Sequence, residues 1–201
     1  RDCLLSRGLG DVYKRQALNF AVHASKFEEF NVSILGAVGQ DFYAKFIMDS
    51  ISDKRIDVSH VRVEEDKVTA NNRTYLTADG DRYYKDDSWT GDIVDKMILN
   101  QDELDFIKKS EVVFIHFWAG CFEQIIDLKK NNNFRLAVDF VEYRNFKDME
   151  KYAPYVDYFM ISGEKSILPI FEAFSKKYKG LFNVTLADKG SVTYYNGEKY
   201  F

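Results

Sequence analysis

Cysteine, proline and long apolar runs are scarce in this sequence. Its 201 residues include two prolines and two cysteines, Cys3 and Cys121. Two cysteines so far apart give neither a metal-ligand spacing nor a disulfide framework, which is typical of a reducing compartment. No apolar run is long enough to span a bilayer, and no signal peptide precedes the first predicted helix. We therefore expect a cytoplasmic protein.

An excess of positive charge is also lacking. The net charge of -4 and the pI near 5.5 give no general attraction to nucleic acid or to an anionic membrane, so neither is expected as a partner. By contrast, 46% of the residues are hydrophobic and 16% are aromatic. This composition is sufficient for a substantial core and predicts a folded globular chain.

Residues 1–16 show no amphipathic period and do not lead into the helix that follows. The stretch Asp11–Gln16 is what the codons of a sequencing-library adapter encode. We therefore interpret 1–16 as adapter-derived and not native, the alternative being a natural disordered arm. The predicted domain covers 17–201.

The second half of the chain alternates short apolar runs with helical patterns. The runs are near-continuous, as expected for strands covered on both faces, so they predict a parallel sheet with crossover helices. The predicted strands are 112–117, 135–139, 157–161 and 182–186, and the predicted helices are 122–130, 147–152 and 169–178. A closing hairpin is predicted over 191–201, with Asn196-Gly197 at its turn.

The first half predicts helices and a small polar sheet. One helix is expected to run to about Phe30, and another over 42–51 with Asp41 as its N-cap. Asn100 and Glu103 form a predicted capping box for a helix to Lys109. Weakly alternating β-like segments lie at 61–63, 69–77 and 82–85, with a turn at 78–81.

Ligands of open α/β sheets bind beyond the carboxyl ends of the strands. In this sequence that rule selects Trp118, Gly120, Asp139, Ser162, Glu164, Asp188 and Lys189. A carboxylate such as that of Asp139, at a buried strand end, must be hydrogen-bonded or functional. Trp118 is expected either to flank a small substrate or to cover the core. His116 lies inside a predicted strand and is interpreted as a structural histidine. No P-loop and no G-x-G-x-x-G occurs, so a nucleotide site of another kind is required and a Rossmann-type oxidoreductase is unsupported.

Asn19 stands at a helix start, and Gly36, Gly39 and Asp41 form a G-x-V-G-x-D-like turn that lets a backbone approach a ligand closely. This pattern resembles the first signature of the ribokinase-like (PfkB) carbohydrate kinases, and the resemblance covers 17–201. It implies an α/β/α three-layer fold with a mostly parallel central sheet, and a small β lid over about 61–85. It also implies ATP and Mg²⁺ as cofactors, and a sugar held by Asn19, Gly39 and Asp41.

In the resembled family the lid lies over the sugar, so Arg73 and Arg82 become candidate substrate-binding residues, the alternative being exposed strand decoration. Pairing of two chains through the lid is implied as well. Thr185–Gly190 looks like the family's T-L-G-x-x-G turn, with Ala187 in place of the first glycine. The nucleotide-binding residues implied are Ser162, Thr185, Asp188, Lys189 and Gly190.

Two parts of the family pattern are altered or missing. The N-x-x-E motif, which helps hold Mg²⁺ through water, reads Ser162-Gly163-Glu164-Lys165, leaving Glu164 as the candidate ligand. The D-T-x-G-A-G-D signature with the general-base Asp is expected beyond Phe201. No catalytic residue is therefore assigned, and the 201-residue chain is expected to be an inactive fragment that lacks both family termini.

The acceptor implied by the resemblance is fructoselysine or another fructosamine, phosphorylated at its 6-hydroxyl. The stretches that look like this branch of the family are 68–70, 80–82, 117–120 and 138–140, together with Ser162. Alternatives are a kinase of fructose, ribose or 2-keto-3-deoxygluconate, or a non-catalytic sugar- or nucleotide-binding protein. Ala44, Ala187 and the altered metal motif motivate the non-catalytic alternative.

Overall fold

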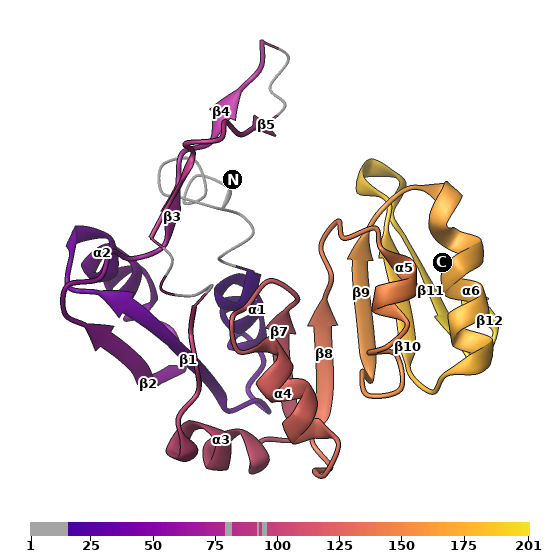
Figure 1. Ribbon diagram of the computed structural model, residues 1–201, viewed down its shortest axis with the longest axis horizontal. Helices are drawn as coiled ribbons and strands as arrows, with labels where there is room; N and C mark the ends of the chain where they lie inside the picture. The colour runs from indigo at the N-terminus through magenta and orange to yellow at the C-terminus, as the bar shows by residue number, and fades with distance from the viewer. Residues whose placement is uncertain (1–15, 79–81, 92, 94–95) are drawn as a thin grey trace. The chain divides into compact units, whose positions relative to one another are not determined.

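The computed structural model describes residues 16–78, 82–91, 93 and 96–201 (Figure 1). The chain divides into two compact units, unit 1 (Arg1–Met97) and unit 2 (Ile98–Phe201). Each unit is described by itself below. Among the helices of the described residues, none is long and apolar enough to cross a membrane.

Unit 2 is built on a six-stranded sheet with the order β12-β11-β10-β9-β8-β7 (Figure 1). Four of its strands are parallel, and each lies within one residue of its predicted bounds: β7 (Val112–His116), β8 (Arg135–Asp139), β9 (Tyr158–Ser162) and β10 (Leu181–Thr185). The predicted closing hairpin is confirmed as β11 (Ser191–Tyr195) and β12 (Glu198–Tyr200). Asn196 and Gly197 have φ of 51° and 80°, the two left-handed residues that a tight hairpin turn needs.

Four α-helices belong to unit 2: α3 (Gln101–Lys108), α4 (Phe122–Lys129), α5 (Phe146–Met149) and α6 (Leu168–Lys177). The predicted capping box is confirmed, because Asn100 Oδ1 accepts from the Glu103 N–H at 3.0 Å and Glu103 Oε2 accepts from the Asn100 N–H at 2.8 Å. The predicted helix 147–152 was too long. From Lys151 to Ala153 each backbone N–H donates to the carbonyl three residues earlier instead of four, so the chain after α5 continues as turns.

The core of unit 2 lies on one face of this sheet. Strand register places Val138, Phe159 and Phe182 side by side, and all three are fully buried. The Phe159 ring contacts the rings of Phe171 and Phe174 in α6, at centroid distances of 5.7 and 6.4 Å. Because side chains alternate along a strand, Asp139 and its β7 register partner His116 lie on the opposite face.

Unit 1 contains a pair of parallel strands with two helices: α1 (Gln16–Ala24), β1 (Val32–Gly39), α2 (Phe42–Ile51) and β2 (Ile56–Glu64). Helix α2 and its Asp41 cap are as predicted, but α1 ends six residues before the predicted end at Phe30. Phe27 and Phe30 are 56% and 54% exposed, so no packing supports further helical turns there. Strand β2 begins five residues before the predicted start at Val61.

The predicted lid strands are much shorter than expected. Within 69–77 the structure has only β3 (Asn71–Asn72) and β4 (Tyr75–Leu76), which pair antiparallel with β6 (Trp89–Thr90) and β5 (Arg82–Tyr83). The Tyr75 and Tyr83 rings stack at 5.4 Å. Residues 79–81 of the predicted turn lie outside the described residues. Weak polar and apolar alternation leaves little to hold longer strands in register.

Candidate functional site

The carboxyl ends of β7, β8, β9 and β10 share one edge of the unit 2 sheet. The site residues predicted for this half of the chain all lie at that edge or in the turns that follow it: Trp118, Gly120, Asp139, Ser162, Glu164, Thr185, Asp188, Lys189 and Gly190. The strand ends of the structure are thus where the strand-end rule and, for Thr185 and Gly190, the family resemblance expected them.

Asp139 is the last residue of β8, and its Oδ1 accepts a hydrogen bond from the Val141 N–H at 2.8 Å. Val141 has a φ of 58°, a left-handed conformation that is costly for a β-branched residue. Burial raises the pKa of the Asp139 carboxyl, and the bond from Val141 only partly opposes this. His116 is buried, at 4% exposure, and its interpretation as a structural histidine stays a prediction.

An aromatic cluster follows the end of β7. The Phe117 ring contacts those of Phe140 and Tyr143, with centroids 5.3 and 4.4 Å apart. Trp118 is 52% exposed, so it does not close the core. Its indole meets Tyr143 edge-on, at 5.5 Å and 88°. Sequence reasoning missed Tyr143, although an aromatic residue four positions after the strand-end Asp139 was a signal.

Two hydroxyl groups lie together at the ends of β9 and β10. Thr185 Oγ1 donates to Ser162 Oγ at 3.2 Å, and the Gly163 N–H donates to the Thr185 carbonyl at 2.9 Å. Arg144 Nη2 donates to the Ser162 carbonyl at 2.6 Å. Ser162, Thr185 and Arg144 are exposed, and sequence reasoning missed Arg144.

The turn after β10 keeps a left-handed backbone at two positions. Ala187 has a φ of 53° and Gly190 a φ of 82° with ψ of -142°. Ala187 thus adopts, in spite of its Cβ, a conformation that suits the glycine of the resembled motif. A Cβ added at Gly190 would meet no atom within 4 Å. The backbone here is therefore open to a ligand, and Asp188 and Lys189 are exposed beside it.

Glu164, the candidate metal ligand, is exposed and directly precedes a short 3-10 turn over Lys165–Ile167. Across the described part of the chain, no group of three or more His, Cys, Asp or Glu side chains is arranged to hold a metal ion. A single carboxylate fits a Mg²⁺ ion that keeps several water ligands and binds substrate phosphates.

In unit 1, Gly39 and Asp41 are held by the chain itself. A Cβ on Gly39 would lie 2.1 Å from the Lys67 carbonyl oxygen, so the predicted close backbone approach is made to the segment 67–69.

Asp41 Oδ1 accepts from the Ala44 N–H at 2.9 Å and from Thr69 Oγ1 at 2.7 Å, and its Oδ2 accepts from the Thr69 N–H at 2.8 Å. Burial acts to raise the pKa of Asp41, but these hydrogen bonds outweigh it and lower the pKa. The geometry favours the cap alternative for Asp41.

Two of the remaining predicted site residues of unit 1 are exposed. Asn19 is exposed in α1. Arg73 is exposed between β3 and β4, and a hydrogen bond with the Tyr75 side chain raises the pKa of its guanidinium. Arg82 belongs to β5, and its side chain lies outside the described residues.

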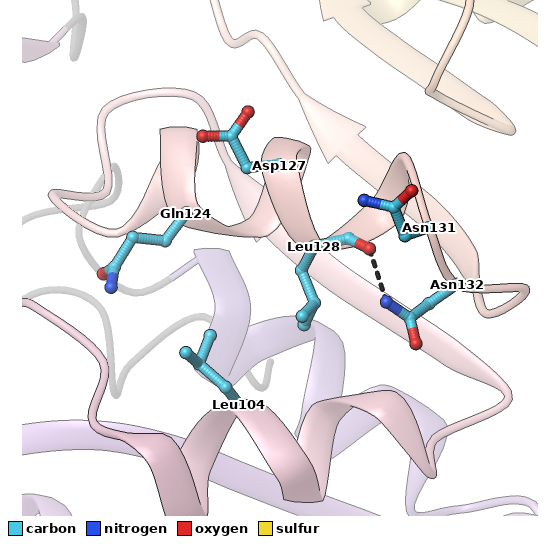
Figure 2. A pocket seen from close by; sticks show the side chains of 6 residues that line it. All are labelled: Leu104, Gln124, Asp127, Leu128, Asn131 and Asn132. Carbon is cyan, nitrogen blue, oxygen red and sulfur yellow. Dashed lines mark hydrogen bonds between the residues drawn. The ribbon is translucent and has the colours of Figure 1, made fainter.

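A shallow depression between α3 and α4 contains no predicted site residue. Its lining comes from Leu104, Gln124, Asp127, Leu128, Asn131 and Asn132. Figure 2 shows the Leu104 and Leu128 side chains facing each other across it. Gln124 bonds the Leu99 backbone at both its oxygen and its nitrogen, and Asn132 Nδ2 donates to the Leu128 carbonyl at 2.7 Å. Because α4 runs away from the end of β7, its last turn lies far from the edge that carries Asp139.

Comparison with known proteins gives a family and a fold. The family model for pfkB family carbohydrate kinases matches residues 16–201. Ribokinase from Arabidopsis thaliana, solved with ribose and ATP, matches with a TM-score of 0.68 at 17% identity. Ribokinase from Giardia lamblia matches with 0.69 at 17%, and a putative ribokinase II from E. coli, solved with ATP and Mg²⁺, with 0.66 at 12%. Among curated proteins, none matches.

These alignments cover 90%, 91% and 92% of this chain, and 64%, 62% and 64% of the respective solved chains. The chain therefore spans less than two thirds of their length. The likeness confirms the predicted ribokinase-like α/β fold with its mostly parallel sheet. Because the family model matches nearly all of the sequence, the chain belongs to the pfkB family of carbohydrate kinases.

Proposed function

We propose that the protein containing this chain transfers the γ-phosphoryl group of ATP, with Mg²⁺, to a hydroxyl of a small sugar. The observation that carries the proposal is the turn after β10, whose left-handed backbone is open at Gly190 beside the hydroxyls of Ser162 and Thr185. Two of the solved neighbours are complexes with ATP, which supports a nucleotide as the ligand of this turn.

In this proposal Asp188 and Lys189 bind the nucleotide together with Ser162, Thr185 and Gly190, and Lys189 meets phosphate oxygens. Glu164 holds Mg²⁺ through water. The bound Mg²⁺–ATP supplies the phosphoryl group and neutralises charge on it.

On the acceptor side, Asp139 accepts a hydrogen bond from a sugar hydroxyl. Trp118 and Gly120 line the sugar, and Asn19, Gly39 and Asp41 remain candidates from unit 1. No stretch of the 201 residues matches D-T-x-G-A-G-D, so no general base is assigned here. We propose that this chain alone shows no turnover.

The acceptor that we propose is fructoselysine or a related fructosamine, phosphorylated at the 6-hydroxyl. Its lysine moiety carries a carboxylate and an ammonium group, so it needs an opposite charge for each. Arg73 is an exposed guanidinium suited to a bidentate carboxylate contact, and Asp86 is an exposed carboxylate suited to the amine. Arg82, Asp79 and Asp81 are further candidates whose side chains lie outside the described residues.

The test is an ADP-release assay of the intact gene product, with fructoselysine, fructose, ribose and 2-keto-3-deoxygluconate at equal concentration. We expect the highest kcat/KM for fructoselysine. A higher value for one of the other three overturns the acceptor and leaves the kinase proposal standing.

The second candidate is a non-catalytic sugar- or nucleotide-binding protein. Two residues favour this candidate. Ala187 has a strained backbone where the family motif has a glycine, and Lys165 stands where the metal motif has a glutamate. Saturable binding of ATP or a sugar without ADP release from any sugar would establish this candidate and overturn the first.

We further propose a cytoplasmic location and pairing of two chains through the lid strands. Light scattering after size-exclusion chromatography tests the pairing. The adapter origin of residues 1–16 is tested by amplifying the region upstream of Ala17 from source DNA.

A further inference from the structure

An exposed indole stands at the carboxyl edge of the unit 2 sheet. Trp118 is 52% exposed, which is unusual for so large an apolar side chain. Its ring meets that of Tyr143 at 5.5 Å and 88°, a favourable edge-to-face contact. We call Trp118 and Tyr143 the aromatic shelf.

The Tyr143 half of the shelf is fixed from three directions. Its ring packs on Phe117 at 4.4 Å, and its backbone N–H donates to the Phe140 carbonyl at 2.9 Å. Its hydroxyl donates to Asp148 Oδ2 at 2.9 Å, and Asp148 is itself paired with Lys151. A ring held in this way supports the indole that leans on it.

The shelf begins at the strand end next to that of Asp139, whose side chain is half-buried. The Phe117 N–H donates to the Asp139 carbonyl at 2.9 Å, so Trp118 leaves the end of β7 one residue after this backbone contact. An exposed flat apolar surface and a half-buried acidic residue therefore arise from two neighbouring strand ends. Sugar rings offer the matching features, a face of C–H groups and a rim of hydroxyls.

We propose that the Trp118 indole stacks on the apolar face of the acceptor's sugar ring while Asp139 accepts from one of its hydroxyls, and that Tyr143 is a positioning residue for the indole. This inference rests on the proposed sugar kinase function and names how the acceptor is held. Aromatic side chains with a few placed polar groups are the usual lining of small-molecule sites.

Tryptophan emission gives a test of binding that does not depend on turnover. The 201 residues include two tryptophans, Trp89 and Trp118. With any tryptophan of the gene product outside these residues replaced by phenylalanine, Trp89→Phe leaves Trp118 as the emitting residue, and Trp118→Phe leaves Trp89. In the intact gene product we expect a saturable change of emission with fructoselysine in the Trp89→Phe variant and none in the Trp118→Phe variant. If calorimetry detects sugar binding to the Trp89→Phe variant but its emission does not change at the same sugar concentrations, the proposed role of the shelf is wrong.

Kinetics give a second test. Trp118→Ala should raise the sugar KM about tenfold, since losing an aromatic contact and its buried area is of that order, and should leave the KM for ATP unchanged. Tyr143→Ala should raise the sugar KM in the same way as Trp118→Ala. Tyr143→Phe keeps the ring, so its sugar KM should stay near that of the wild type. If Tyr143→Ala does not fold, the exposed Trp118→Ala variant still decides the matter.

The matched control is Tyr195→Ala. Tyr195 is 48% exposed and pairs with Leu181, at the opposite edge of the sheet, so neither KM should change. If Trp118→Ala releases ADP in a sugar-dependent way with an unaltered sugar KM, the proposed role of the shelf is wrong and the kinase proposal stands. A sugar-dependent change of Trp118 emission without ADP release supports the shelf and overturns the kinase.

Discussion

Asp41 in unit 1 and Asp139 in unit 2 were both predicted to bind a sugar, and the fold treats the two carboxylates differently. Both oxygens of Asp41 accept hydrogen bonds from Ala44 and Thr69. Asp139 accepts one from Val141, through one oxygen. Accordingly, the pKa of Asp41 lies below its ordinary value, whereas burial places that of Asp139 above it. Asp41 therefore uses both carboxylate oxygens within its own unit, whereas Asp139 uses one.

The cores of the two units differ as well. Unit 2 buries Phe140, Phe159, Phe171 and Phe182 completely, whereas Phe27, Phe30 and Phe42 of unit 1 are largely exposed. A rigid aromatic core is what holds strand ends, and therefore the side chains at them, in fixed places.

The largest expected effect is in the unit 2 core. Phe159 is fully buried and stacks on Phe140 at 4.0 Å. Phe159→Ala should lower the free energy of unfolding by about 3–5 kcal/mol, because it removes apolar contact and leaves a cavity. Urea denaturation followed by circular dichroism measures this. The matched Phe27→Ala change in unit 1, where the ring is 56% exposed, should cost less than about 1 kcal/mol. Equal costs would contradict the contrast between the units.

The next effect concerns Asp41. Asp41→Ala removes the α2 cap and two bonds from Thr69, and should cost about 2–3 kcal/mol of stability. Since the pKa of Asp41 is lowered in the folded state, this contribution is present above the ordinary carboxyl value of 3.8 and is lost as the pH falls through the folded pKa. The difference between wild type and variant should shrink below about pH 4. A difference that is the same at pH 3 and pH 7 would show that the charge is not involved.

Asp139→Asn should show the opposite pattern. It should lower kcat/KM for the sugar by about ten- to a hundredfold, as expected for about 1.5–3 kcal/mol from a charged hydrogen bond, with the KM for ATP unchanged. The unfolding free energy at pH 7 should rise, because the raised pKa makes the charged form unfavourable as the pH rises through it. That gain should disappear towards pH 4. Loss of stability with unchanged sugar kinetics would make Asp139 a structural residue.

The smallest effect is at Ala187. Ala187→Gly should raise the unfolding free energy by about 1 kcal/mol, since glycine adopts a φ of 53° without strain. Asn196→Gly, at a φ of 51°, is the control and should change little, because Asn tolerates this region. Thermal melts of the two variants give the comparison. A destabilised Ala187→Gly would mean that the alanine methyl group packs favourably.

Sequence reasoning succeeded where the signal was local or periodic. Apolar runs gave the four parallel strands to within one residue, Asn100 and Glu103 gave a capping box, and Asn196-Gly197 gave the hairpin turn. It failed at the end of α1 and in the lid strands, where the pattern was compatible with longer elements but packing did not support them. The helix predicted over 147–152 was also too long, because the backbone N–H groups after Glu150 bond three residues back instead of four.

For the candidate site, the sequence by itself determined which residues stand at strand ends, because a parallel strand that stops at Asp139 or Thr185 must present its next residues at one edge. Only the tertiary structure decided what each side chain does there. It joined Asp41 to Thr69 across 28 positions of the chain, set Tyr143 against Trp118 and brought Arg144 to the Ser162 carbonyl. Such contacts depend on burial and on partners distant in sequence, and no local pattern encodes them.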